Sequence, residues 1–123
     1  MDKTEKIENL WLRLANPVQC HLWQKTALVR EDLAMDVVLI LIEESHLERA
    51  IMRCSQCGQC YFCEWYEEID WDGGDDKMYT TYIPIQWDEN LINALKQRSP
   101  FELLAVTPRL QWDNGGEIKW IGK

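Results

Sequence analysis

The sequence predicts an α+β fold in a single domain, residues 1–123, with a mainly antiparallel sheet and two or three short helices. Two observations support this prediction. Short β-prone runs are separated by turns rich in glycine and aspartate, whereas helical periodicity is confined to brief segments. In addition, 123 residues with 46% hydrophobic and 28% charged side chains have the size and composition of one globular domain.

An N-terminal helix is expected within the first fifteen residues. Its apolar side chains recur at intervals of three and four, the spacing of one helix face: Ile7, Leu10, Trp11 and Leu14. Pro17 ends this pattern, because the residue before a proline is pushed out of the α region. From Val18 to Met35 the apolar residues follow no clear period, and no element is predicted there.

The segment that precedes the cysteines allows more than one interpretation. Residues 37–42 are six consecutive apolar residues, which indicate a buried central strand, although the same run could extend a helix from Asp32. Ser45 and Glu48 have the spacing of a capping box, which would begin a short helix. Alternatively, residues 47–53 form a strand that leads into the cysteines.

Two β-hairpins are predicted further along the chain. Residues 61–66 are rich in aromatic side chains and are expected to pair with residues 78–83. The turn between them contains Asp72-Gly73-Gly74-Asp75, whose residues tolerate positive φ. The second hairpin covers residues 110–121, where apolar and polar residues alternate on both sides of an Asp-Asn-Gly-Gly turn.

Two helices are expected between these hairpins. Asp88 is the predicted N-cap of the first, which would turn Leu91, Ile92 and Leu95 towards the core. The second begins at a capping box, with Ser99 followed three residues later by a glutamate and with a proline at the first helical position.

The cysteines give the strongest chemical signal in the chain. Of the five, four fall within ten residues at a spacing of three: Cys54, Cys57, Cys60 and Cys63. A disulfide framework would spread its cysteines to join distant segments, whereas this arrangement concentrates them. The N-terminus has no apolar signal-peptide core, and the longest apolar run is too short to span a membrane. We therefore expect a cytoplasmic protein with reduced thiols available for a metal.

The segment Cys54-Ser55-Gln56-Cys57-Gly58 resembles the knuckle of a zinc ribbon. Two residues between the cysteines let a turn aim both thiolates at one ion, and Gly58 permits positive φ as the chain leaves the turn. The resemblance covers only residues 53–61 and implies a zinc-ligand role for Cys54 and Cys57. The second knuckle of a zinc ribbon is absent, because no cysteine follows Cys63.

Several sets of residues could complete the four ligands of a zinc ion. Cys60 and Cys63 are the nearest candidates in sequence, and we take Cys54, Cys57, Cys60 and Cys63 as the expected set. If residues 60–63 form a strand, however, Cys60 and Cys63 point to opposite faces, which favours Cys60 as the third ligand. Cys20 or His21 could instead close the site from the N-terminal part of the chain. Two chains of a homodimer, each giving two ligands, are the remaining arrangement.

Two other roles of the cysteines stay open. The spacing approaches that of an iron–sulfur cluster motif, although the last gap is one residue short and Glu64 stands where that motif has proline. A redox or iron–sulfur accessory protein is therefore the alternative function. The cysteines could also be inert core residues, since a buried free cysteine packs as a small hydrophobe.

An acidic run follows the cysteines directly. Seven of the 21 acidic residues lie between residues 64 and 76, and the formal net charge of the chain is −8. Such a charge argues against direct binding of nucleic acid or an anionic membrane and favours a basic protein partner. A tryptophan within an acidic surface suits such an interface. The expected partner-binding residues are Asp70, Trp71, Asp72, Asp75 and Asp76.

The predicted function is therefore a small acidic, metal-stabilised protein-binding module, of the kind that acts as an inhibitor or immunity-type protein. No catalytic residue is predicted, because no nucleophile has an assignable base and no glycine-rich phosphate loop is present.

Overall fold

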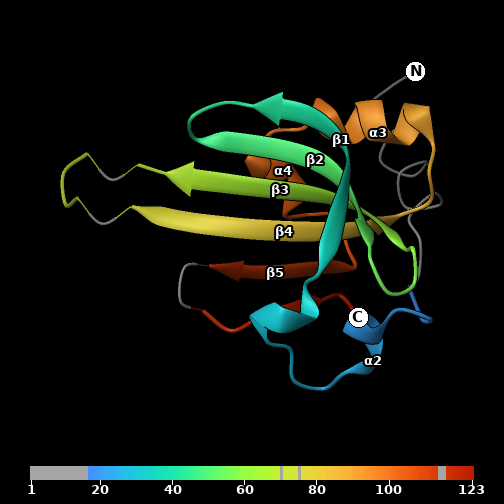
Figure 1. Cartoon of the computed structure of the whole chain (residues 1–123). Coiled ribbons are helices and arrows are strands. Elements are labelled where there is room, and N and C mark those ends of the chain that lie inside the picture. Colours follow the sequence, from blue (N-terminus) through green and yellow to red (C-terminus); the bar gives the residue numbers. More distant parts are fainter. Residues whose placement is uncertain (1–16, 70, 75, 114–115) are drawn as a thin grey trace.

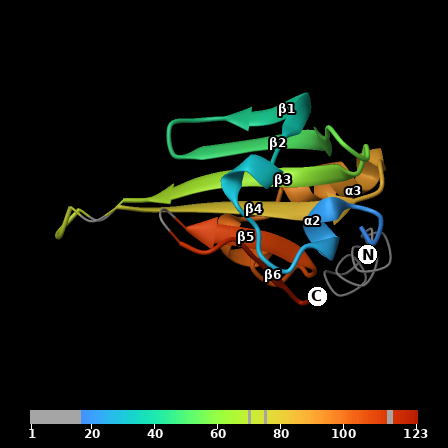
Figure 2. The same ribbon diagram turned by 60° about the horizontal axis from the view of Figure 1, so that its bottom comes forward.

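A computed structural model describes residues 17–69, 71–74, 76–113 and 116–123, so the helix expected within the first fifteen residues lies outside the described part. The described residues form one open sheet with short helices on both faces (Figures 1 and 2). Its strands are β1 (Met35–Glu43), β2 (Leu47–Cys54), β3 (Cys60–Glu68), β4 (Lys77–Ile85), β5 (Arg109–Asp113) and β6 (Lys119–Ile121). The helical segments are α2 (His21–Gln24), the 3-10 turn η1 (Arg30–Asp32), α3 (Glu89–Lys96) and α4 (Pro100–Leu103).

The six strands follow one another in space in the order of the sequence, and every neighbouring pair is antiparallel. This confirms the predicted α+β class with a mainly antiparallel sheet. Both predicted hairpins are present, as β3–β4 and β5–β6, and Gly74 in the first turn has a φ of +69°. Within the described residues no helix has the length and apolarity needed to cross a membrane.

The sequence prediction of a buried central strand at residues 37–42 was wrong in its position. These residues do form a strand, but among the described residues it lies at the edge of the sheet and pairs only with β2. Four consecutive apolar side chains on it are exposed: Val37, Val38, Leu39 and Ile40. A continuous apolar run indicates burial on both faces only when other layers cover the strand, and the exposure of these four side chains shows that β1 is not covered in this way.

The segment after β1 resolves the two interpretations of Ser45 and Glu48. Residues Leu47–Cys54 form strand β2, so the capping-box helix is wrong and the strand alternative is confirmed. The turn before β2 is tight, because Glu44 N–H donates to the Leu47 carbonyl over 2.9 Å. Strand β2 thus delivers the chain directly to Cys54.

One face of the sheet is covered by α3 and α4, whose caps are those predicted. The Asp88 side chain accepts a 3.0 Å hydrogen bond from Leu91 N–H, and Ser99 forms a reciprocal capping box with Glu102. Helix α3 buries its apolar side against a largely aliphatic core, called here the helix-side core. Its buried members are Ile51, Phe62, Ile83, Ile85, Leu91, Ile92, Leu95, Leu103 and Val106.

A buried ion pair joins this face of the sheet to the end of α3. Arg49 on β2 and Glu64 on β3 are 2% and 5% exposed, and their side chains approach to 2.7 Å. Arg49 also donates to the carbonyl of Lys96 over 2.7 Å. The guanidinium therefore satisfies both a carboxylate and a carbonyl at the C-terminus of α3.

The opposite face carries a second core, called here the cysteine-side core. Its buried residues are Cys20, Leu22, Cys54, Tyr61, Cys63 and Leu110. The cover on this face is residues 17–34, which contain only α2 and η1 as helical turns. Trp120 of β6 holds this segment, because its Nε1–H donates to the Leu22 carbonyl over 2.7 Å. Figure 2 shows α2 on the opposite side of the sheet from α3.

Candidate metal centre and docking arm

The turn between β2 and β3 presents the two cysteines of the knuckle motif. Cys54 is the last residue of β2, and its N–H donates to the Gln59 carbonyl over 2.9 Å. Gly58 N–H returns to the Cys54 carbonyl, also over 2.9 Å, and Gly58 has a φ of +81°. The positive φ expected at this glycine is confirmed, and it allows the five-residue turn to close.

A segment that is distant in sequence brings a third cysteine to this turn. Cys20 immediately precedes α2, and its N–H donates to the Pro17 carbonyl over 2.9 Å. The far end of the same segment is tied to the turn itself, because Ser55 donates from both its N–H and its hydroxyl to the Ala34 carbonyl. Residues 17–34 are therefore attached next to the knuckle at both of their ends.

The sulfur atoms of Cys20, Cys54 and Cys57 all lie within 4.8 Å of one another. Cys20 and Cys54 are buried, whereas Cys57 is exposed to solvent. All five cysteines are free of disulfides. Three sulfurs from two segments, converging at the edge of a core, form an arrangement that can hold a metal ion.

The surroundings shift the pKa values of the two buried thiols, Cys20 and Cys54, in opposite directions. Burial raises the pKa of Cys20 to about 12, although the neighbouring Tyr61 hydroxyl and the Leu22 N–H act in the opposite direction. Burial also opposes ionisation of Cys54, but the backbone N–H groups of Cys57 and Gln56, together with the Cys57 and Cys20 thiols, outweigh it and lower the pKa of Cys54 below its usual value. N–H groups aimed at a sulfur stabilise a thiolate, the form that binds metal.

Cys60 and Cys63 lie outside this group of sulfurs. They occupy β3 three residues apart and therefore face opposite sides of the sheet, as the strand interpretation predicted. Cys60 packs against the helix-side core, and Cys63 belongs to the cysteine-side core. Burial raises the pKa of Cys63 well above its usual value. Of the expected set, the structure unites only Cys54 and Cys57, and it supplies the third sulfur from Cys20.

The imidazole of His21 lies beside the sulfurs. Its Nδ1 is 3.7 Å from the Sγ of Cys54, and its Nε2 is 2.7 Å from the carbonyl oxygen of Asp32. The ring is half-buried, and it lies outside the group of three sulfurs that are all mutually close. His21 and Cys20 were the two alternative ligands expected from the N-terminal part of the chain.

Tyr61 contributes a polar atom that the sequence analysis did not single out. Its side chain is fully buried in the cysteine-side core, and its hydroxyl is a neighbour of the Cys20 sulfur. Among the described residues this hydroxyl has no hydrogen-bond partner of acceptable geometry. A buried hydroxyl without a partner is costly, so its position beside a sulfur is informative.

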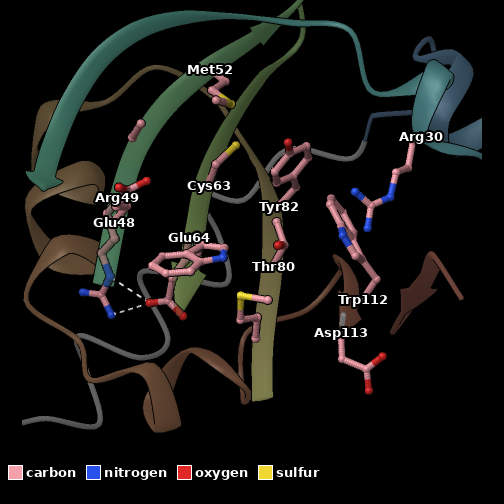
Figure 3. A pocket seen from close by; sticks show the side chains of 13 residues that line it. Arg30, Glu48, Arg49, Met52, Cys63, Glu64, Thr80, Tyr82, Trp112 and Asp113 are labelled. Atoms are coloured by element: carbon pink, nitrogen blue, oxygen red, sulfur yellow. Dashed lines mark hydrogen bonds and ion pairs between the residues drawn. The ribbon is translucent and has the colours of Figure 1, made fainter. Parts of the chain in front are cut away.

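A pocket of about 430 Å³ opens on the cysteine-side face (Figure 3), and Cys20, Cys54 and Cys57 are not among the residues that line it. Aromatic side chains form much of its wall, namely Trp65, Tyr82 and Trp112, and Arg30 of η1 reaches towards Trp112. Tyr82 and Trp112 meet edge to face, with ring centroids 5.1 Å apart. Cys63 lies in this pocket between Met52 and Tyr82, which separates it from the candidate metal ligands.

Most of the acidic run lies at the end of β3 opposite to the turn that carries Cys54 and Cys57 (Figure 1), whereas Glu64 is buried within the sheet. Strands β3 and β4 remain paired to Glu68 and Lys77, whereas the pairing of β2 with β3 ends at Tyr66 and that of β5 with β4 ends at Tyr79. Residues 68–77 are called here the arm, and those of them that the structure describes extend past the neighbouring strands.

The arm carries an exposed tryptophan. Trp71 is 89% exposed, the largest exposed fraction among the large apolar side chains of the described residues. Asp72 is exposed and Asp76 is half-buried. Asp70 and Asp75, which were also expected to bind the partner, lie outside the described residues.

Comparisons of this chain with protein-family models, with curated proteins and with solved structures give no significant match.

Proposed function

We propose that this protein is a zinc-stabilised protein-binding module, in which Cys20, Cys54 and Cys57 hold the metal and the acidic arm docks on a basic protein. The single observation that carries the proposal is the convergence of three sulfurs from two segments that are more than thirty residues apart in sequence. An inhibitor or immunity-type role is the biological form that a compact acidic module of this size would take.

Zinc is the metal that this donor set favours. Thiolate sulfur selects zinc, copper(I) or iron–sulfur clusters, and structural zinc sites are four-coordinate with cysteine and histidine ligands. An iron–sulfur cluster commonly uses four thiolates, and Cys60 and Cys63 lie outside the group of close sulfurs. The donor set therefore supports zinc more than the redox or iron–sulfur alternative.

The metal would act on folding rather than on catalysis. Cys20 belongs to the segment that covers the cysteine-side core, and Cys54 and Cys57 belong to the turn of the sheet beneath it. An ion bound by all three joins cover and sheet by coordinate bonds. Since a metal that binds only the folded chain adds its binding energy to folding, the ion stabilises this face.

The docking half of the proposal rests on the arm. A protruding hairpin with a largely exposed tryptophan presents an anchor of the type that dominates protein interfaces. Five acidic residues and one lysine within residues 68–77 surround this anchor with negative charge. A basic surface with an apolar pocket for the indole is the complementary partner, because opposite potentials speed the encounter.

Elemental analysis and an absorption spectrum of the full-length protein, purified without air, test the metal half. We expect one zinc per chain and no visible band. Iron together with broad absorbance at about 400 nm would contradict zinc and favour the iron–sulfur alternative. Absence of metal from a folded chain, at stoichiometric zinc supply, would show that the cysteines are inert core residues.

The docking half is tested with a synthetic arginine-rich peptide as the basic probe. The double substitution Asp72→Asn/Asp76→Asn should weaken binding by roughly 3- to 10-fold and reduce its dependence on salt. Asp36→Asn/Glu89→Gln is the matched control, because it removes the same charge from two exposed side chains near the other end of the sheet. Equal losses in both variants would mean that the peptide senses only the net charge, which would contradict a docking site on the arm.

A further inference from the structure

We propose that His21 is the fourth ligand of the metal centre and that it binds through Nδ1, giving a site of three cysteines and one histidine. This inference rests on the proposed zinc site and specifies its coordination. Cys20 and His21 are adjacent in sequence, so both ligands of the N-terminal segment come from the start of α2.

The first support is distance. Zinc binds sulfur at about 2.3 Å and imidazole nitrogen at about 2.1 Å, so a tetrahedral site requires about 3.6 Å between the two donor atoms. His21 Nδ1 lies 3.7 Å from Cys54 Sγ, which is already this separation. The pair therefore needs little rearrangement to share an ion.

The second support is the hydrogen bond on the other side of the ring. The Asp32 carbonyl oxygen is only an acceptor, so at 2.7 Å the His21 Nε2 must carry the proton and donate it. In the neutral ring this leaves the lone pair on Nδ1, the nitrogen that faces Cys54. Histidines that bind metals usually donate their second N–H to a carboxylate or to a backbone carbonyl in this way.

The carbonyl that orients His21 is itself held in place. The Asp32 carboxylate accepts hydrogen bonds from the Lys25 side chain over 2.6 Å and from the Val29 N–H over 2.9 Å. These contacts close the loop between α2 and η1 on itself. These local hydrogen bonds therefore hold the Asp32 carbonyl in position to accept from the His21 ring. The ring thus takes this orientation from contacts of the chain itself.

The buried Tyr61 hydroxyl bears on Cys20, the proposed ligand next to His21 in sequence. This group makes no hydrogen bond of acceptable geometry among the described residues, although it lies beside the Cys20 thiol and lowers the pKa of that thiol. A thiol sulfur is a weak acceptor, whereas a metal-bound thiolate accepts a hydrogen bond readily. Coordination of zinc by Cys20 thus supplies the partner that the Tyr61 hydroxyl lacks.

A modest closure of the site is required for all four ligands together. The three sulfurs lie within 4.8 Å of one another, but tetrahedral zinc brings bound sulfurs to about 3.8 Å. The same contraction draws the His21 ring, already against Cys54, towards Cys20 and Cys57. The closure concerns side chains around a turn with one exposed member, Cys57, which leaves an entry path for the ion.

The test uses the full-length protein loaded with zinc alone. X-ray absorption should give three sulfur ligands and one nitrogen ligand per zinc. Long-range ¹H–¹⁵N NMR of the histidine rings should show metal-bound Nδ1 and protonated Nε2 for His21. His21→Ala should remove the nitrogen ligand and weaken zinc binding by at least about 10-fold. His46→Ala, the matched control, should change neither, because His46 is exposed and pairs with Glu67.

The outcomes separate this inference from the proposed function. Two results would overturn the inference and leave the zinc-stabilised module standing. One is zinc binding by His21→Ala with an unchanged X-ray absorption spectrum. The other is a wild-type NMR spectrum in which zinc is bound but the His21 ring is metal-free. A chain that binds no zinc would overturn both. Since the NMR measurement needs no substitution, the inference stays falsifiable even if His21→Ala fails to fold.

Discussion

The two faces of the sheet are stabilised by different means. The helix-side core is largely aliphatic. It is covered by two capped helices, of which α3 has eight residues. The cysteine-side core has six buried residues, three of them cysteines, under a segment whose longest helix has four residues. A short helix contributes little stability of its own in water. The first face is therefore stabilised by packing, and the thin cover of the second is consistent with our proposal that a metal cross-links cover and sheet there.

Removal of zinc should have the largest effect and should act on one face. At free zinc about 1,000 times its dissociation constant, the ion contributes about 4 kcal/mol to the free energy of unfolding, and a chelator removes this contribution. Hydrogen exchange should show lost protection first in residues 21–33 and 119–121, while β3 and β4 remain protected. Uniform loss of protection over both faces would contradict the comparison.

Arg49→Met should be the most damaging substitution on the helix side. It leaves the Glu64 carboxylate buried without its partner, which costs about 3 kcal/mol or more in chemical denaturation. Adding Glu64→Leu should recover most of this loss, since two apolar residues replace the pair. A double variant as unstable as Arg49→Met alone would show that the carbonyl contact to α3, not the carboxylate, sets the cost.

The same variant has a pH dependence with a definite sign. Burial raises the pKa of Glu64 above its usual value, and Arg49 offsets part of that rise. A carboxyl with a raised folded-state pKa favours the folded chain below the unfolded pKa, and this advantage is lost as pH rises through the folded-state pKa. Arg49→Met should therefore destabilise the protein more at pH 7 than at pH 4.5. Equal losses at both values would contradict an uncompensated carboxylate.

Leu91→Ala separates stability from metal binding. The side chain is fully buried in the helix-side core, so its truncation should lower the free energy of unfolding by at least about 2 kcal/mol. Zinc stoichiometry at 25 °C should stay at one per chain, because the three proposed sulfur ligands lie outside this core. The cysteine that packs against it is Cys60, which is not a proposed ligand. Loss of zinc from folded Leu91→Ala would mean that the two faces are not independent.

Asp88→Ala should have the smallest effect and sharpen the contrast between the helices. The Asp88 side chain caps α3 through Leu91 N–H, and loss of such a cap costs about 1 kcal/mol. Cys20, at the equivalent position of α2, makes no side-chain cap. A denaturant titration of Asp88→Ala measures the expected shift, and no shift would show that packing alone fixes α3.

Much of the helix-side face could be predicted from the sequence. The caps at Asp88 and Ser99 are local chemistry, and the β3–β4 hairpin follows from aromatic-rich runs around glycines. The place of β1 could not be predicted, because the apolar run at residues 37–42 does not say whether a layer covers it. Sheet order decides that, and sheet order is a property of the whole chain.

The metal centre could be predicted only in part. The local knuckle gives Cys54 and Cys57, and the period of two along a strand already separates Cys60 from Cys63. Cys20 joins the site through the path of residues 17–34, a segment without periodicity, so it stood only as an alternative. Nothing in the sequence signals the roles of the Asp32 carbonyl or of the Tyr61 hydroxyl, since both depend on contacts made after folding.

Native mass spectrometry of three full-length forms measures the central claim most directly, because it counts the zinc ions on each folded chain. If Cys20, Cys54 and Cys57 bind the ion, we expect one zinc on the wild type, one on Cys60→Ser and none on Cys57→Ser. All three forms are compared at the same limiting zinc concentration. Cys57 and Cys60 lie three residues apart, so the two substitutions form a close pair. Loss of zinc from Cys60→Ser together with its retention by Cys57→Ser would contradict the account.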